Sequence, residues 1–265
     1  MSDSLLINDD GHVRTITLNR PEVKNALSLE LGWGIVEAID DAAKDDNVWI
    51  VAITGTGDAF CSGLDLRGSA PYEHHTAQTA YLDDLGWVSN FPLAMRQRCD
   101  KPVVAGINGV AVGAGLSLAL AADIRLMARN ARILAGYPRI GGSPDGGMTW
   151  TLSQAIGYEK TMRFLLENRT VTGDEAYALG IVGEVVDDDK FADRLNEYCQ
   201  LLVSTVSPIT ARLTKRTVGK ATTAIDVESQ LRLEIRSIGL AFGSSDGKEA
   251  RAAFMEKRKP VFEGK

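Results

Sequence analysis

Short apolar runs that alternate with helical patterns constrain the fold of this chain more than any other feature. VWIVAIT (residues 48–54) and PVVAGI (residues 102–107) have the length and composition of strands buried on both faces. A helical pattern that Ser28 can cap precedes the first run, and a predicted helix over residues 79–98 precedes the second. DIRLMA and ARIL follow as further strand-like runs. Such alternation predicts a parallel sheet with crossover helices.

The two ends of the chain depart from this alternation. Two short β-rich runs around Asp10 and Gly11 predict a hairpin near the N-terminal end. From residue 145 onward the pattern is mostly helical, and we expect no strand in the last third of the chain. The helices predicted there cover residues 146–156, 159–167, 174–179, 188–204, 208–219, 224–241 and 248–257. The fold class is therefore α/β, with a C-terminal helical region that must cover its own core or another subunit.

Composition and charge exclude several classes of function. With 45% hydrophobic residues, the 265-residue chain can bury a sizeable core, which excludes a disordered or fibrous protein. The formal net charge of -6 argues against nucleic acid as a partner, because phosphate binding needs a concentrated basic surface. No charged and then apolar leader opens the chain, and the glycine-bearing stretch 102–122 is typical of strand, turn and helix rather than a membrane span. We expect a soluble, cytoplasmic protein that binds neither nucleic acid nor membrane.

Cysteine and histidine usage does not indicate a metal centre. Cys61, Cys99 and Cys199 are an odd number of cysteines, far apart, without the spacing of paired metal ligands. We expect reduced thiols that are mostly buried. His74 and His75 are the adjacent pair that a zinc site would have to use, but neighbouring histidines more often lie on a solvated loop.

Two glycine-bearing segments follow the apolar strands, FCSGLDLRG (residues 60–68) and GVAVGAGLSLAL (residues 109–120). Glycine lets the backbone approach a ligand closely, and the first N–H groups of a helix lack internal acceptors. Two such turns can therefore aim two donors at one oxyanion. On composition alone, tight turns and close packing are the simpler interpretation. GAGLSL also lacks the last glycine of a dinucleotide-binding fingerprint and comes too late in the chain for one.

One carboxylate, Asp145, stands in the glycine-rich run GGSPDGG (residues 141–147), just ahead of an apolar helical stretch. Aspartate is a favoured N-cap, and the residues alone favour that role. A carboxylate on such a turn could also be a reacting group with a displaced pKa. Trp87 and Phe91, four residues apart on a predicted helix, could face a nearby pocket, although aromatic residues at this spacing more often belong to the core.

A series of motifs resembles the crotonase (enoyl-CoA hydratase/isomerase) superfamily and covers nearly the whole chain in the family's order. They are NRPEVKNALS, FCSGLDL, KPVVAGINGVAVGAGLSLALAADIRLMA, LGIVGEVV and AFMEKRKPVF. The resemblance implies a ββα spiral core over residues 1–200 and a C-terminal helical region over 201–265 that packs across subunits in a homotrimer or hexamer. It also implies an acyl-CoA thioester as ligand, with CoA as part of the substrate and no other cofactor. The backbone N–H groups of Leu64 and Ala114 would hold the thioester oxygen.

The same resemblance suggests where coenzyme A binds. Lys24, Ala26, Arg67 and Lys257 match positions that contact the CoA moiety in relatives, and Lys257 would come from a neighbouring subunit. Without the resemblance, the three charged residues among them would be read as ordinary solvated charges.

This chain departs from the hydratases of that family at both catalytic glutamates. Ser117 and Tyr137 stand at the two positions, so hydration by two carboxylates is doubtful. Asp145 remains, and SPDGG is similar to the aspartate-bearing turns of the family's isomerases, naphthoate synthases and aryl-CoA dehalogenases. Tyr137 could donate a hydrogen bond to the acyl group or stack on an aromatic one. The histidine that dehalogenases use matches Asn90, which puts hydrolytic dehalogenation in doubt.

The sequence therefore predicts an enzyme that stabilises a thioester enolate, with enoyl-CoA isomerisation favoured and Asp145 as its base. An atypical hydratase is the nearest alternative, and a second acid could come from Glu73, Asp83 or Asp84. An aryl-CoA dehalogenase or thioester hydrolase comes next. The alternative outside the enzymes is a non-catalytic paralogue that only binds acyl-CoA.

Overall fold

The structure is a computed structural model, and it describes residues 4–67 and 86–265. Its larger sheet has six strands in the order β1-β2-β3-β5-β7-β10, all parallel to their neighbours except β1, which is antiparallel to β2. The bounds are β1 (Leu5–Asp10), β2 (Val13–Leu18), β3 (Ile50–Gly55), β5 (Val103–Ile107), β7 (Ile124–Ala128) and β10 (Glu184–Val186). The predicted parallel sheet and N-terminal hairpin are thus confirmed.

A second, smaller sheet carries the strands that lead into the glycine-bearing turns. Its four strands run in the order β4-β6-β8-β9, and β4, β6 and β8 are parallel. The strands are β4 (Ala59–Cys61), β6 (Val110–Val112), β8 (Arg132–Leu134) and β9 (Val171–Thr172). Because β4 and β6 are paired, the segments that follow them lie side by side.

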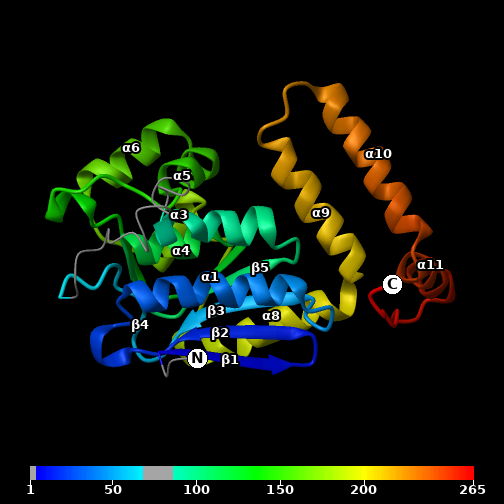
Figure 1. The fold of residues 1–265 in the computed structure, drawn as a ribbon, viewed down its shortest axis with the longest axis horizontal. Helices are drawn as coiled ribbons and strands as arrows, with labels where there is room; N and C mark the ends of the chain where they lie inside the picture. Colours follow the sequence, from blue (N-terminus) through cyan, green and yellow to red (C-terminus); the bar gives the residue numbers. More distant parts are fainter. Residues whose placement is uncertain (1–3, 68–85) are drawn as a thin grey trace, which may run out of the picture.

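Helices cover both sheets and extend beyond them at one end (Figure 1). They are α1 (Leu29–Lys44), α3 (Gly86–Leu93), α4 (Ala114–Ala121), α5 (Met148–Ile156), α6 (Tyr158–Glu167), α7 (Gly173–Leu179), α8 (Phe191–Thr205), α9 (Pro208–Ala221), α10 (Val227–Gly243) and α11 (Ser245–Glu256). The predicted N-cap Ser28 accepts a hydrogen bond from the Leu31 N–H. All eight residues of α4 are buried, which places this helix in the core. No described helix is long and apolar enough to cross a membrane.

Two expectations about elements need correction. The last third of the chain contains a strand, β10, which the sequence did not signal because three residues are too few for a periodic pattern. The predicted helix 79–98 begins outside the described residues and continues from residue 86 as α3. It then changes at Ala94–Arg98 into a π-helical segment, which begins two residues after Pro92, whose missing N–H interrupts regular helical bonding.

The predicted burial of the cysteines is confirmed. Cys61, Cys99 and Cys199 are free and buried. Burial raises the pKa of Cys61 and of Cys199 to about 12, so neither thiol ionises near neutral pH.

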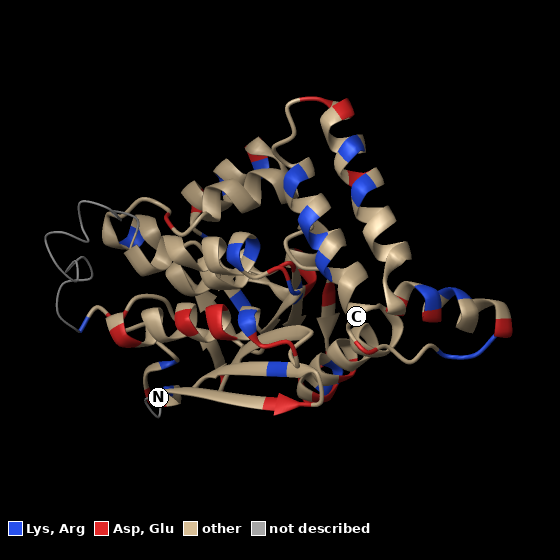
Figure 2. Cartoon of the chain, turned by 45° about the vertical axis from the view of Figure 1, so that its right-hand side comes forward, with Lys and Arg blue, Asp and Glu red and all other residues tan. Residues whose placement is uncertain are grey.

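The C-terminal helices α9, α10 and α11 stand apart from the sheets (Figure 1). Helix α9 carries basic residues and no acidic one (Figure 2). One of them, Lys215, anchors the helix: its ammonium group donates to the Lys101 carbonyl at 2.7 Å and pairs with Asp123 at 2.7 Å. The predicted boundary after residue 200 falls inside α8 and stays a prediction.

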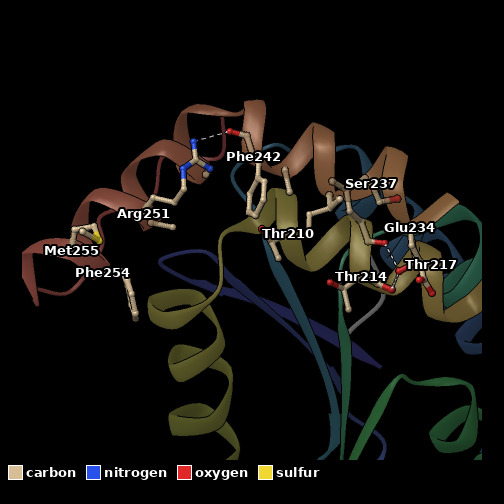
Figure 3. Close-up of a pocket in the computed structure, with 14 residues that line it drawn as sticks. Thr210, Thr214, Thr217, Glu234, Ser237, Phe242, Arg251, Phe254 and Met255 are labelled. Carbon is tan, nitrogen blue, oxygen red and sulfur yellow. Dashed lines mark hydrogen bonds between the residues drawn. The ribbon is translucent and has the colours of Figure 1, made fainter. Parts of the chain in front are cut away.

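An open hollow of about 690 Å³ lies between these C-terminal helices (Figure 3). Its lining is mostly apolar and includes Ile238, Phe242 and Phe254. The Arg251 guanidinium lies 5.1 Å from the Phe242 ring and donates to the Phe242 carbonyl at 3.0 Å. The hollow is lined by residues 210–255, whereas Asp145 lies in the turn before α5, so the two are separate.

Candidate active site

Asp145 lies in the turn between a 3₁₀ segment, Tyr137–Ile140, and α5. Gly147, not Asp145, is the N-cap of α5, and no side chain caps this helix. The Asp145 carboxylate instead accepts a hydrogen bond from the Tyr137 hydroxyl, with 2.6 Å between the two oxygens. The cap interpretation is therefore wrong for this carboxylate, and its side chain is available for chemistry.

Three side chains from separate elements meet at this turn. The Tyr137 hydroxyl lies 3.2 Å from the Ser117 hydroxyl, and Ser117 donates to the backbone carbonyl of Asp145 at 2.9 Å. Ser117 and Tyr137 are buried, whereas Asp145 is half-buried. Ser117 and Tyr137, which the resemblance predicts to stand at the two glutamate positions of hydratases, thus both contact Asp145.

Burial sets the electrostatics of this cluster. It raises the pKa of the Asp145 carboxyl above its ordinary value of 3.8, and the hydrogen bond from Tyr137 partly offsets that rise. Burial also raises the pKa of Tyr137, and the neighbouring Asp145 charge adds to the effect. Tyr137 therefore remains a neutral donor, while Asp145 is a carboxylate whose basicity is increased.

The Asp145 turn fills the space that a longer side chain at residue 117 would need. Gly146 has φ +60°, and a Cβ atom built there would lie 2.8 Å from the Ser117 Cβ. The turn therefore packs directly on α4 at Ser117. A glutamate at this position could fit only if the turn moved, so the serine and the aspartate-bearing turn belong together.

The two predicted oxyanion donors lie on adjacent segments. Gly63 has φ +94°, and a Cβ atom there would be 2.7 Å from the Val112 carbonyl oxygen and 3.7 Å from the Ala114 nitrogen. Two hydrogen bonds hold the Leu64 segment against Leu27: Leu27 N–H to the Gly63 carbonyl at 2.7 Å, and Asp65 N–H to the Leu27 carbonyl at 2.9 Å. Glycine at residue 63 thus permits the close approach of the two turns.

Both donors are free for a ligand as far as the described residues show. Ala114 is the first residue of α4, whose N-cap Gly113 contributes no side chain. Within residues 4–67 and 86–265, neither the Leu64 N–H nor the Ala114 N–H has a hydrogen-bond acceptor. Ser117, which holds Asp145, lies three residues beyond Ala114 and bonds back to the Gly113 carbonyl at 2.9 Å. The Asp145 backbone and one predicted oxyanion donor are thus joined through a single helical turn.

Helix α3 covers the Asp145 turn with residues that the sequence analysis did not select. A Cβ atom on Gly146 would lie 2.8 Å from the Val88 side chain, and one on Gly147 would lie 3.3 Å from Pro92. Trp87 faces the other way and packs over Gly32 of α1. In the sequence, only the four-residue spacing of Val88 and Pro92 could have indicated that they share a helix face. Apolar residues at that spacing are too common to indicate a functional site.

The aromatic pair on α3 is part of the core. Trp87 and Phe91 are both buried, and their rings meet edge to face with centroids 5.6 Å apart. Asn90 is also buried; its side chain donates to the Gly86 carbonyl at 2.9 Å and accepts from Arg98 at 3.1 Å. Asn90, which the resemblance predicts to stand at the dehalogenase histidine position, therefore belongs to a structural hydrogen-bond network.

Lys24 and Ala26 lie on a loop beside the Leu64 segment. The Ser62 N–H donates to the Lys24 carbonyl at 2.9 Å, and buried Asn25 donates to the Ala59 carbonyl at 2.8 Å. The Lys24 side chain is exposed, with its ammonium 3.8 Å from Asp58. Ala26 is buried. This loop therefore adjoins the first oxyanion donor.

The other two residues predicted to contact CoA lie at opposite ends of the molecule. Arg67 has an exposed side chain 3.4 Å from Asp65, close in sequence to the Leu64 donor. Lys257 is the exposed C-cap of α11, at the far side of the chain from α4 and α5 (Figure 1). A single chain does not bring Lys257 to the site.

Several sequence-based expectations fall on residues 68–85. Glu73, His74, His75, Asp83 and Asp84 lie outside the described residues. In the part of the chain that the structure describes, no group of three His, Cys, Asp or Glu side chains is arranged to hold a metal ion.

The chain is similar to known proteins over its full length. A family profile described as "Enoyl-CoA hydratase/isomerase" matches residues 8–265. The chain is 34% identical over 269 positions to the 1,2-epoxyphenylacetyl-CoA isomerase of Escherichia coli K12, covering 100% of both chains. It is 30% identical to the short-chain-enoyl-CoA hydratase of Clostridium acetobutylicum, covering 97% of this chain and 96% of that one. The crystal structure of an enoyl-CoA hydratase from Bacillus anthracis matches with a TM-score of 0.88 at 28% identity, covering 99% of this chain and 100% of that one.

Proposed function

Because the chain belongs to the enoyl-CoA hydratase/isomerase family, we propose that it is an enoyl-CoA isomerase whose base is Asp145. The observation that carries the proposal is the half-buried Asp145 carboxylate, which Tyr137 holds, on a turn whose backbone is bonded to Ser117, three residues after Ala114. The resemblance of its turn to those of isomerases supports the same assignment. So does the similarity to an isomerase, although similar proteins include hydratases as well.

The proposed reaction moves a double bond by moving one proton. The thioester oxygen of a 3-enoyl-CoA accepts hydrogen bonds from the Leu64 and Ala114 N–H groups, and the carbonyl becomes an electron sink. Asp145 removes a proton from C2, and the electrons of that C–H bond pass into the dienolate, whose negative charge rests on the thioester oxygen. The protonated Asp145 then returns a proton to C4, which yields the conjugated 2-enoyl-CoA. No atom is gained or lost.

Hydration fits these residues less well. Adding water across the double bond needs one group to activate water and another to manage the α-proton. Ser117 and Tyr137 stand at the two predicted glutamate positions, and each hydroxyl already donates its proton to Asp145, Tyr137 to the carboxylate and Ser117 to the backbone carbonyl. One carboxylate suffices for proton transfer between two carbons, so the described residues favour isomerisation.

Coenzyme A would lie along the loop that carries Lys24 and Ala26. Lys24 and Arg67 are exposed cations near the Leu64 segment, where they can pair with phosphate groups. Lys257 would reach the site of a neighbouring subunit, since its own chain holds it far from Asp145. The acyl-CoA is a substrate, and the proposed reaction needs no further cofactor.

Asp145→Asn tests the assignment. We expect kcat for a trans-3-enoyl-CoA to fall by about 10³-fold, because the amide cannot take a proton. The Kd of a saturated acyl-CoA should not change, since CoA binding does not involve this side chain. Asp193→Asn, an exposed aspartate of α8, is the matched control and should behave as wild type. Full turnover by Asp145→Asn would refute the role of this residue.

A further inference from the structure

We propose that Tyr137 is a positioning residue, which holds one oxygen of the Asp145 carboxylate and leaves the other, Oδ2, as the oxygen that takes and returns the proton. The inference rests on the proposed function, in which Asp145 is the base. It replaces the expectation that Tyr137 acts on the acyl group. Removal of the proton from C2 and its return to C4 would then both use the same carboxylate oxygen, held in one orientation.

The hydroxyl protons available at this cluster support that division. Tyr137 has one hydroxyl proton, and the short 2.6 Å contact to Asp145 Oδ1 uses it. Ser117 also has one, and it goes to the Asp145 backbone carbonyl at 2.9 Å. The serine therefore fixes the main chain of residue 145 while the tyrosine fixes its carboxylate. In the described part of the chain, no side chain other than Tyr137 donates a hydrogen bond to this carboxylate, and the other contribution comes from the backbone N–H of Asp145 itself.

Tyr137 is itself held in place without a ligand. Its ring is buried, and the residue before it, Gly136, has φ +81° and donates its N–H to the Asn168 side chain at 2.8 Å. The Gly142 N–H donates to the Tyr137 carbonyl at 3.0 Å and closes the turn. A hydrogen-bond donor that is itself fixed restricts the rotation of the carboxylate that it binds. A general base needs such a fixed orientation toward the proton that it removes.

The hydrogen bond also sets the pH range in which Asp145 is ionised. Burial raises the pKa of Asp145, and the Tyr137 hydrogen bond lowers it. The other elements packed on the turn present uncharged groups, Ser117 from α4 and Val88 from α3, and the nearby Arg139 side chain is exposed. Tyr137 is therefore the titratable group that opposes the effect of burial among the described residues.

Tyr137→Phe tests this role because it removes the hydroxyl and keeps the ring. We expect the acid limb of kcat/KM to move up by about one pH unit, since the carboxylate loses the donor that favours its charged form. At the plateau kcat should fall about tenfold through loss of orientation. KM should be unchanged, because the hydroxyl does not bind substrate in this account. Tyr158→Phe, at an exposed tyrosine of α6, is the matched control.

A second measurement separates this proposal from the proposed function. The infrared band of the Asp145 carboxyl, identified by its loss in Asp145→Asn, is titrated in wild type and in Tyr137→Phe. A higher titration midpoint in Tyr137→Phe supports the role of Tyr137, whether or not the protein turns over a 3-enoyl-CoA. Absence of 3-enoyl-CoA turnover would overturn only the isomerase assignment. An unchanged midpoint together with an unmoved acid limb would overturn the positioning role.

If Tyr137→Phe does not fold, 3-fluorotyrosine at residue 137 serves instead. Its more acidic phenol is a stronger donor, so the Asp145 midpoint and the acid limb should both move to lower pH. Movement in the other direction, or none, would contradict the proposal.

Discussion

Asp145 acquires its chemical character from the side chains around it. An exposed aspartate is a weak base, but here burial raises the carboxyl pKa while Tyr137 and Ser117 hold the carboxylate and its backbone. The residue is half-buried rather than enclosed, so one oxygen can meet a substrate. A single carboxylate in this setting is suited to carrying one proton between two carbons of the same molecule.

The raised pKa predicts the direction of the pH dependence. In the proposed reaction Asp145 acts in its ionised form, so turnover should fall as pH drops through its pKa, which lies above the ordinary 3.8. The acid limb of kcat/KM should therefore lie at higher pH than the titration of an exposed aspartate. Initial rates across the acidic range measure it, with circular dichroism at each pH as the control for unfolding. Full activity down to pH values near 3.8 would contradict the account.

At the scale of elements, α4 connects the parts of the site. Its first residue, Ala114, supplies the N–H proposed as an oxyanion donor, and Ser117 holds the Asp145 turn. At its C-terminal end, half-buried Arg96 donates to the Leu120 and Ala121 carbonyls, so a cation lies at the negative end of the helix. Complete burial of α4 keeps these groups in fixed relation.

Ser117→Glu tests the link between α4 and the Asp145 turn. We expect it to lower the free energy of unfolding by about 3 kcal/mol, because a buried glutamate has to displace the turn that packs on Ser117. It should also lose isomerisation without gaining hydration. Ser117→Ala, the control, should cost about 1 kcal/mol for one lost hydrogen bond. Chemical denaturation measures the free energy of unfolding of both variants. A Ser117→Glu protein as stable as wild type that hydrates 2-enoyl-CoA would contradict the link between Ser117 and the Asp145 turn.

The elements that could be predicted from the sequence are those with long or strongly marked patterns. The apolar run at residues 48–54 became β3, and the Ser28 cap begins α1 as expected. Strand β10 was missed because its three residues depend on pairing with β7 rather than on their own pattern.

The site was predictable in its residues but not in its contacts. The choice of Asp145 came from its unusual place in a glycine-rich turn and from the family resemblance, and Tyr137 and Ser117 came from the missing glutamates. That their hydroxyls both bond to Asp145 depends on how α4 packs on the turn. Local sequence does not indicate which side chains meet across a tertiary contact.

At the scale of the whole molecule, the C-terminal helices present an apolar face that no described residue of the chain covers. No residue of α10 is buried, and Leu231, Ile235 and Phe242 each expose half or more of their surface. An exposed patch of this kind typically marks a protein interface. Together with the remote position of Lys257, it supports the proposal that subunits assemble through this region.

Assembly predicts a mass well above that of one 28.6 kDa chain. We expect the wild type to sediment as a trimer or hexamer, and the double variant Leu231→Glu, Ile235→Glu to sediment as a smaller species. Each buried aliphatic side chain contributes about 2 kcal/mol to such an interface, and charges there are strongly unfavourable. Lys44→Glu on the exposed side of α1 is the control. A wild type that sediments as a monomer at micromolar concentration would contradict the proposed assembly.

The most direct test of the central claim is the product mass when a trans-3-enoyl-CoA is incubated with the protein in D₂O. We predict a conjugated 2-enoyl-CoA with no added water, with deuterium at C2 or C4 wherever the proton on Asp145 exchanges with solvent, and no conversion by Asp145→Asn. A product heavier by one water, formed equally by the Asp145→Asn protein, would contradict the account and assign the chemistry to another acid.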